Sequence, residues 1–222
     1  MIIHSPNKTR NQNIVGNWGN LVKEKLQIIG GHSGNKILDV GCFSGEYVFY
    51  LNKKGYDAYG CDIKENLSWK KNISKFQIGS LYSLPYNNKS FDTILVFEVL
   101  EHLEALRIAL RELKRVSRKN VIISVPNCEL PPIFNLSGLS FYHNIDKSHI
   151  NRFTEKDLVE LLLQEDFKID LVTKISPIKP IILLLHTLYF PVFLTNFIAK
   201  IFNRLPSRKL YSDIVIVASI VN

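Results

Sequence analysis

The chain has 222 residues, of which 46% are hydrophobic and 22% are charged, a balance that is typical of a globular protein and excludes a disordered one. This length is enough for one well-cored domain, with room for an insertion. The formal net charge of +8 suits an anionic partner, either nucleic acid or a lipid surface, but charge alone does not choose between the two.

The start of the chain predicts an arm followed by a helix. Residues 1–16 are polar, rich in asparagine and without a period, so we expect a flexible arm and no signal peptide. From Asn17, a cap residue, apolar positions recur at helical spacing to Ile29, and Gly30-Gly31 is predicted to end the helix. The three cysteines are odd in number and lack metal-ligand spacing, which favours reduced thiols in the cytoplasm.

Residues 36–47 are the stretch around which the chain is organised, and they read KILDVGCFSGEY. A short apolar run, two glycines four residues apart and then a helical pattern predict a strand, a tight turn and a helix. Gly41 and Gly45 allow positive φ and close approach of a ligand, and the helix N-terminus offers free N–H groups to an anion. The dinucleotide and phosphate-loop patterns are both missing, so a ligand carboxylate is favoured over a diphosphate.

The next two predicted strands also end at polar residues. Residues 56–62 form the second strand and close on Asp62, which lies 23 residues beyond Asp39. In a doubly wound sheet this strand end borders the ligand crevice, where a carboxylate can accept both hydroxyls of a ribose. Residues 75–79 form the third strand, which is followed by Ser80 and Leu81.

The remaining elements alternate strand and helix. Residues 91–97 are predicted as a buried strand, a helix continues to Leu113, and residues 120–127 form the fifth strand. Residues 128–150 are a long irregular segment that we expect to cover the acceptor pocket. Thr154 and Asp157 form a capping box at the next helix, residues 167–175 are the sixth strand and residues 211–221 the last.

Three stretches carry a resemblance to a known family. DVGCFSG at residues 39–45 resembles the first motif of class I S-adenosylmethionine-dependent methyltransferases, which commonly has glycine where Phe43 stands. Residues 83–103 resemble the quinone-type and related small-molecule methyltransferases, and residues 149–154 also match that group. The resemblance implies an α/β fold, with a doubly wound, mostly parallel seven-stranded sheet whose last strand is antiparallel between the fifth and sixth.

The resemblance also implies a cofactor, S-adenosylmethionine, and a set of residues that bind it. Asp62 would accept the ribose hydroxyls, Ile63 and Leu81 would cover the two adenine faces, and Ser80 stands where the family generally has an acid. The implied cofactor-binding residues are Asp39, Gly41, Cys42, Gly45, Asp62, Ile63, Ser80, Leu81 and Phe97.

Methyl transfer from a sulfonium needs little covalent help, so few catalytic residues are expected. If the acceptor atom is a hydroxyl oxygen, a nearby base would help, and His149 is the candidate because the family match places it over the crevice. The alternative is a histidine that only anchors the loop.

Glu98, Glu101 and His102 follow one another at i, i+3 and i+4, which would place them on one face of a helical turn. Small-RNA 3′-terminal ribose methyltransferases use a similar pattern, with a later histidine, to hold a divalent metal. Relatives that need no metal share the same letters, and a solvated acidic turn is the commoner outcome, so we assign no metal ligand.

Residues 181–202 are almost entirely apolar, with no charge between Lys179 and Lys200. A straight helix of this length would span roughly 33 Å, but the flanking strands share one sheet, which requires an even number of crossings. We therefore expect the insertion at residues 177–209 to form a hairpin bent at Pro191 that dips into one leaflet, with a substrate lid or a homodimer contact as alternatives.

These observations predict a methyltransferase domain over residues 17–222, acting on a small-molecule or lipid-linked acceptor, at oxygen, on the cytoplasmic side of a membrane. One alternative is a metal-dependent RNA ribose methyltransferase, although nucleic acid is the less favoured partner. Another is a non-catalytic protein that binds adenosylmethionine or scaffolds a membrane.

Overall fold

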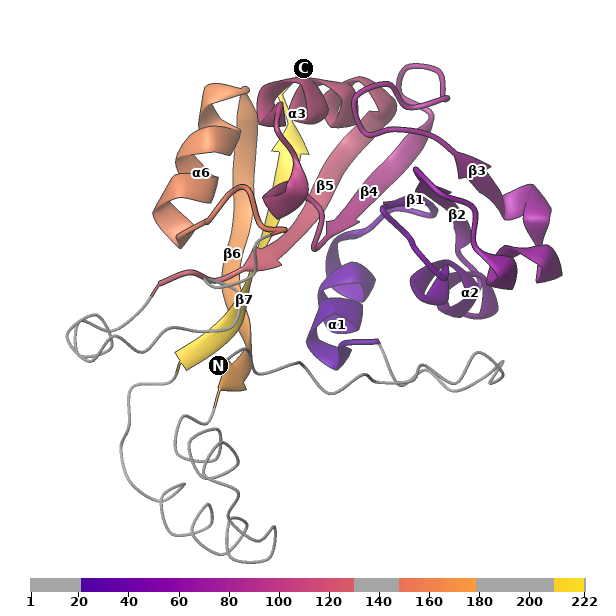
Figure 1. The fold of residues 1–222 in the computed structure, drawn as a ribbon, viewed down its shortest axis with the longest axis horizontal. Coiled ribbons are helices and arrows are strands. Elements are labelled where there is room, and N and C mark those ends of the chain that lie inside the picture. The colour runs from indigo at the N-terminus through magenta and orange to yellow at the C-terminus, as the bar shows by residue number, and fades with distance from the viewer. Residues whose placement is uncertain (1–20, 130–147, 179–209, 222) are drawn as a thin grey trace, which may run out of the picture.

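The computed structural model describes residues 21–129, 148–178 and 210–221 (Figure 1). The predicted arm at residues 1–16 and the apolar run at 181–202 lie outside the described residues, as does most of the loop at 128–150. Within the described ranges, no helix is long and apolar enough to span a membrane.

A seven-stranded sheet in the order β3-β2-β1-β4-β5-β7-β6 forms the centre of the molecule. Strand β7 is antiparallel to β5 and to β6, whereas the other neighbouring strands are parallel. The predicted doubly wound sheet with an antiparallel last strand is therefore confirmed. The strands are β1 (Lys36–Val40), β2 (Asp57–Asp62), β3 (Phe76–Ile78), β4 (Phe91–Phe97), β5 (Ser117–Pro126), β6 (Phe167–Ile178) and β7 (Leu210–Ile220).

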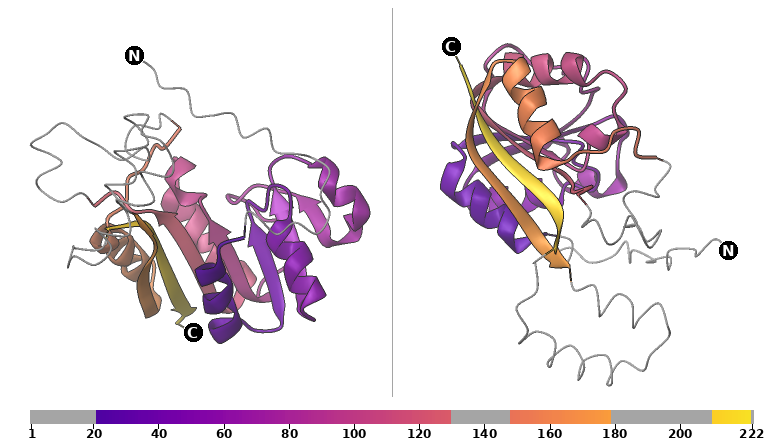
Figure 2. Two further views of the ribbon diagram at one scale, coloured as in Figure 1. Left: turned by 90° about the horizontal axis from the view of Figure 1, so that it is seen from below. Right: turned by 90° about the vertical axis from the view of Figure 1, so that its left-hand side faces the viewer.

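Helices cover both faces of the sheet, as the two views of Figure 2 show. Helices α1 (Lys23–His32) and α2 (Glu46–Lys53) lie on one face, and α3 (Leu106–Val116) and α6 (Glu155–Gln164) lie on the other. The predicted capping box at α6 is present, with the Thr154 side chain accepting from the Asp157 N–H and the Asp157 side chain accepting in return.

The central parallel strands β1 and β4 are largely buried because each face of the sheet packs against helices. In β1, Ile37 contributes to the core under α1 and α2, whereas Leu38 contributes to the core under α3 and α6. Both side chains are completely buried, which stabilises the fold by roughly 2 kcal/mol for each side chain. This packing holds the carboxyl ends of β1, β2 and β4 in a fixed arrangement.

The predicted end of the first helix is wrong. Helix α1 continues through Gly30-Gly31 to His32 and ends at Ser33, whose N–H and hydroxyl both donate to the carbonyl of Ile29. Both glycines are exposed, so the helix interior imposes no packing conflict on them. The common glycine stop is a residue with positive φ, and neither of these glycines has one.

Candidate active site

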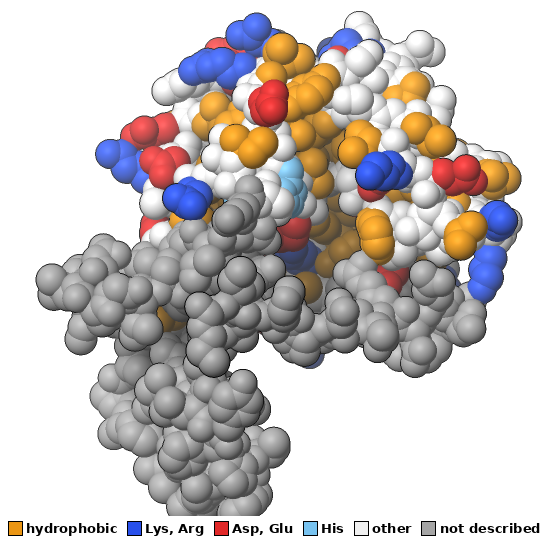
Figure 3. Space-filling view, in the orientation of Figure 1, with side chains coloured by type: hydrophobic (Ala, Val, Ile, Leu, Met, Phe, Trp, Pro, Cys, Tyr) orange, Lys and Arg blue, Asp and Glu red, His pale blue; other side chains and the backbone are white. Residues whose placement is uncertain are grey.

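The strand order reverses between β1 and β4, which are parallel neighbours in the sheet. The strands that follow β1 lie on one side of this pair, and the strand that follows β4 lies on the other. In open α/β sheets ligands bind in the crevice outside the carboxyl ends of the strands at such a switch point. Figure 3 shows a hollow lined with hydrophobic side chains near the centre of the molecule, with histidine, acidic and basic side chains beside it.

The loop after β1 has the backbone conformation that its glycines predict. Gly41 and Gly45 have φ of 75° and 77°, and Phe43 between them has φ of 45°. Phe43 therefore adopts the left-handed conformation that a glycine usually holds. Gly41 is also needed for space, because a Cβ there would lie 2.4 Å from Cγ2 of Val99.

Asp62 ends β2 and is fixed against this loop. Its carboxylate accepts from the N–H of Phe43 at 2.8 Å and from the N–H of Lys64 at 3.2 Å. Ile63 beside it is 67% exposed, which provides an accessible apolar surface next to the acid. The two residues thus combine an oriented acceptor with an apolar surface, as an adenosine requires.

Asp39 lies near the end of β1 and is 3% exposed. The pKa of Asp39 is raised to about 8, mainly by burial and also by the Asp62 carboxylate, while the Lys25 ammonium opposes the rise. Two carboxyl groups at the ends of neighbouring strands suit a ligand that carries positive charge and hydroxyls. They disfavour binding of a diphosphate, which is negatively charged.

The other predicted cofactor residues lie around the same strand ends. The Cys42 thiol is buried, which raises its pKa and makes it an inert packing group rather than a nucleophile. Ser80, just after β3, accepts from the N–H of Tyr82 at 3.2 Å, and Leu81 is buried. Phe97 ends β4 and is half-buried, with the Lys25 ammonium 4.9 Å from its ring centroid.

The predicted helical turn carrying Glu98, Glu101 and His102 is wrong. Glu98 has φ of 55°, which breaks any helix at that point, and only Leu100–His102 form a short 3-10 turn. The Glu98 carboxylate points instead to Lys25 and Ser124, at 2.8 and 2.5 Å. It is therefore already bound within the protein and does not join the other two side chains.

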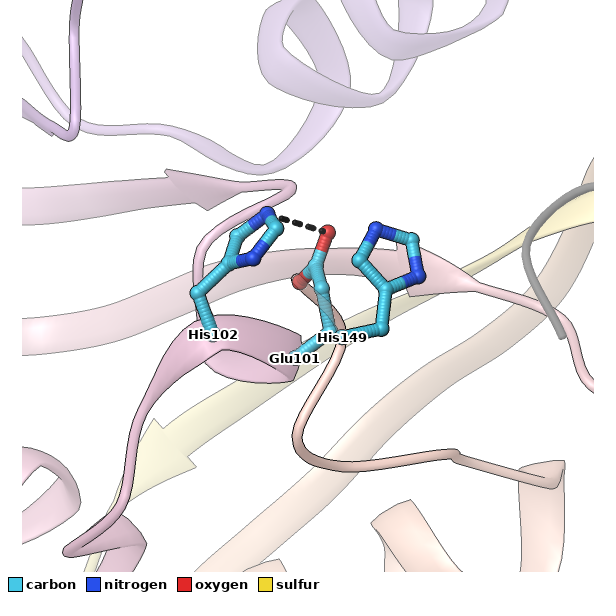
Figure 4. A group of neighbouring side chains, drawn as sticks. All are labelled: Glu101, His102 and His149. Carbon is cyan, nitrogen blue, oxygen red and sulfur yellow. Dashed lines mark ion pairs between the residues drawn. The ribbon is translucent and has the colours of Figure 1, made fainter. Parts of the chain in front are cut away.

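Glu101 and His102 instead face His149, which comes from the segment before α6 (Figure 4). The His102 and His149 rings lie edge to face with centroids 4.9 Å apart. Burial raises the pKa of Glu101 to about 8, and the nearby Glu98 carboxylate adds to the effect. The structure thus places the predicted base, His149, beside a buried carboxyl group.

Asn151 and Lys25 are important here and were not predicted from the sequence. Asn151 donates from its backbone to the Glu101 carbonyl at 2.9 Å and from its side chain to the carbonyls of Leu100 and Leu103. It therefore fixes His149 against Glu101, and its place within the matched segment 149–154 was the available signal. No sequence pattern indicated the buried position of Lys25, because a single lysine in a helix is normally predicted to be exposed to solvent.

Comparison with known proteins shows what the chain resembles. Residues 38–125 match the family model described as a methyltransferase domain. A demethylmenaquinone methyltransferase from Corynebacterium efficiens is 25% identical over 121 residues, which cover 53% of this chain and 51% of that protein. An uncharacterised protein from Methanocaldococcus jannaschii is 30% identical over 114 residues, covering 48% of this chain and 49% of that protein. The chain thus spans about half the length of these relatives.

Solved structures agree with the observed fold. A putative methyltransferase from Bacillus halodurans superposes with a TM-score of 0.61 at 15% identity, covering 90% of this chain and 98% of that one. A Burkholderia thailandensis 1,6-didemethyltoxoflavin-N1-methyltransferase gives 0.62 at 16% identity, covering 90% of this chain and 78% of that one. As the sequence resemblance predicted, residues 38–125 match a methyltransferase domain, and the chain has the fold of the S-adenosylmethionine-dependent methyltransferases.

Proposed function

We propose that this protein transfers a methyl group from S-adenosylmethionine to an oxygen atom of a small-molecule or lipid-linked acceptor. The observation that carries the proposal is Asp62, whose carboxylate is held by the Phe43 N–H at the mouth of the glycine loop of a methyltransferase domain. The carboxyl groups of Asp39 and Asp62 match a cofactor with an ammonium, a sulfonium and two ribose hydroxyls.

The cofactor supplies an already activated methyl group, so the protein has to position and orient the reactants. Asp62 and Ile63 hold and cover the adenosine, with Ser80 and Leu81 on its other side. Asp39 and the N-terminus of α2, which begins after Gly45, receive the charged amino-acid end. Gly41 and Cys42 keep the loop backbone close to the ligand, and Phe97 borders the methyl-bearing part.

His149 takes the proton from the acceptor hydroxyl in this proposal. A neutral imidazole near a buried carboxyl group is suited to this role, because the two groups can share and pass on a proton. Glu101 is that carboxyl group, and Asn151 fixes the chain on which His149 lies. The base is thus held at the end of β4, next to the strand ends assigned to the cofactor.

The lining of the hollow and the relatives support this choice of acceptor class. Hydrophobic side chains line the hollow in Figure 3, which suits an apolar or aromatic acceptor. The Corynebacterium efficiens relative is named for demethylmenaquinone, and the Burkholderia thailandensis structure contains 1,6-didemethyltoxoflavin. The same proposal places the protein in the cytoplasm, with residues 181–202 in contact with a membrane surface.

Titration calorimetry with S-adenosylmethionine and with its demethylated product tests the proposal. The wild-type protein should bind both ligands, and Asp62→Asn should weaken binding by at least about tenfold, because an ionic acceptor for the ribose hydroxyls is lost. Glu160→Gln, on the exposed face of α6, is the matched control and should bind normally. Absence of wild-type binding, or equal affinity in Asp62→Asn, would overturn the assignment.

A further inference from the structure

The Glu101 side chain is buried without a complete set of partners. The residue is 1% exposed, and within the described residues its Oε2 atom has no hydrogen-bond partner. Its Oε1 atom lies 3.9 Å from Nε2 of His102, which is too far for a hydrogen bond. A buried carboxylate oxygen without a partner is costly, so this group is built to receive a proton or a cation.

The hydrogen bond on the far side of the His102 ring determines which ring nitrogen carries the hydrogen. Nδ1 of His102 lies 2.8 Å from the carbonyl oxygen of Ser148. A carbonyl only accepts, so Nδ1 carries the hydrogen, and in the neutral ring Nε2 presents a lone pair toward Glu101. This is how histidines that bind metals are usually oriented, with the second nitrogen donating to a backbone carbonyl.

His149 completes a group of three donors. One donor atom from each of Glu101, His102 and His149 lies within 4.8 Å of the other two, and Figure 4 shows the carboxylate between the two rings. The backbone under the group is fixed, because the Asn151 N–H donates to the Glu101 carbonyl at 2.9 Å. The segment carrying His149 is thus tied to the turn carrying the other two residues.

We propose that Glu101, His102 and His149 bind a divalent transition-metal cation. Metal bonds of about 2.1 Å place ligand atoms roughly 3 to 3.5 Å apart, so the side chains have to close by about 1 Å from the distances seen here. Small rotations about the side-chain bonds provide that movement. Two imidazole nitrogens and one carboxylate favour zinc, manganese, cobalt or iron(II), whereas magnesium and calcium prefer oxygen ligands.

Three protein ligands leave coordination positions open, which gives the cation a role in acceptor recognition. This step rests on the proposed function, whereas cation binding itself does not. An acceptor with two neighbouring oxygens, such as a catechol or a vicinal diol, could occupy the open positions. With the cation bound, His149 is a ligand and no longer a base, and the cation lowers the pKa of the acceptor hydroxyl.

Cation binding is measured on untagged full-length protein, after treatment with a chelator and without cofactor or acceptor. Calorimetry with Mn²⁺, Co²⁺, Zn²⁺ and Mg²⁺ should show one transition-metal ion bound per chain at micromolar concentration, and Mg²⁺ at least about a hundredfold more weakly. The visible spectrum of Co²⁺ provides a second readout, because its ligand-field bands change when imidazole replaces water.

Loss of a ligand should weaken cation binding selectively. Glu101→Gln, His102→Ala and His149→Ala should each lower affinity at least about tenfold and remove the Co²⁺ bands. His102 is 41% exposed in its side chain, so its alanine variant keeps the test valid if Glu101→Gln fails to fold. Glu160→Gln and His32→Ala are the controls: the first removes an exposed carboxylate of α6 that pairs with Lys156, and the second removes a histidine elsewhere on the surface.

Two results would overturn the cation site. In the first, no transition metal binds below about 100 µM, which leaves Glu101 as a buried acid that binds a proton. In the second, His102→Ala and His149→Ala bind the ion as tightly as the His32→Ala control does. Neither result bears on the calorimetry with S-adenosylmethionine, so the cation site and the methyltransferase proposal fail or stand separately.

Discussion

The backbone N–H of Phe43 donates to the carboxylate of Asp62 over 2.8 Å, and this bond joins the loop after β1 to the end of β2. On its other side, the Phe43 carbonyl accepts from Nε1 of Trp69 at 2.9 Å. Both backbone polar groups of Phe43 are therefore held in place. This explains how a phenylalanine keeps the left-handed conformation, with φ of 45°, that the resembled motif usually assigns to glycine.

Substitutions at Phe43 should separate backbone conformation from side-chain burial. Phe43 is 53% exposed, so little apolar burial is lost on substitution. Phe43→Asn should keep wild-type stability within about 0.5 kcal/mol, because asparagine tolerates positive φ. Phe43→Val should be less stable than Phe43→Asn by about 1 to 2 kcal/mol, because a β-branched residue is strained there. Urea unfolding measures both values, and equal stabilities would show that the loop relaxes.

Cofactor affinity should depend on pH through Asp39, whose pKa is raised to about 8, chiefly by burial. The Asp62 carboxylate contributes to this rise and the Lys25 ammonium opposes it, whereas the neighbouring Cys42 and Tyr47 have raised pKa values and remain neutral near pH 7. Below pH 8 Asp39 is mostly protonated, and a cationic ligand favours the ionised form. Binding therefore releases a proton, and affinity should rise with pH by up to about tenfold per unit until pH 8.

Calorimetry at pH 6.5, 7.5 and 8.5 in buffers of different ionisation enthalpy measures this proton release directly. The control is Asp39→Asn, which should bind with a smaller pH dependence and release less than half as much proton. The remaining dependence in that variant comes from the ligand, whose amino group titrates near pH 8. If wild type and Asp39→Asn show the same pH profile, Asp39 does not sense the ligand charge.

The sequence predicted the fold because its signals are local and repeated. The apolar strand runs, the paired glycines at 41 and 45 and the capping box of Thr154 and Asp157 each require one local conformation. Each of these conformations is present in the structure. The family resemblance then supplied the strand order, which local patterns alone do not determine.

The arrangement of Glu98, Glu101 and His102 could not be predicted in the same way. The spacing of Glu98, Glu101 and His102 fits a helix, but Glu98 lies at a strand end where its positive φ is fixed by distant partners. Lys25, 73 residues earlier, draws its carboxylate away from the other two. The local spacing of residues cannot indicate a contact between residues so far apart in the chain. The same holds for the position of His149 beside Glu101 and His102.

Lys25 is a buried cation amid acidic groups, and its removal should be costly. Its side chain is 5% exposed and pairs with Glu98, and it lowers the pKa of Asp39 and of Glu101. Lys25→Met keeps the length of the side chain but leaves several carboxyl groups without their cation. Because Glu98 is 37% exposed and partly screened by solvent, we expect the free energy of unfolding to fall by about 1 to 3 kcal/mol at pH 8.

A double-mutant cycle distinguishes this electrostatic role from simple packing. Glu98→Gln removes the charge that Lys25 neutralises, so Lys25→Met should cost at least about 1 kcal/mol less in the Glu98→Gln background than in the wild type. The loss in Lys25→Met should also be smaller at pH 6 than at pH 8. The pKa of Asp39 and that of Glu101 are about 8, so at pH 6 fewer charges remain to be neutralised. Urea unfolding of the four proteins at both pH values provides the measurement. A loss that is independent of pH and additive with Glu98→Gln would mean that Lys25 acts through the packing of its buried side chain rather than through its charge.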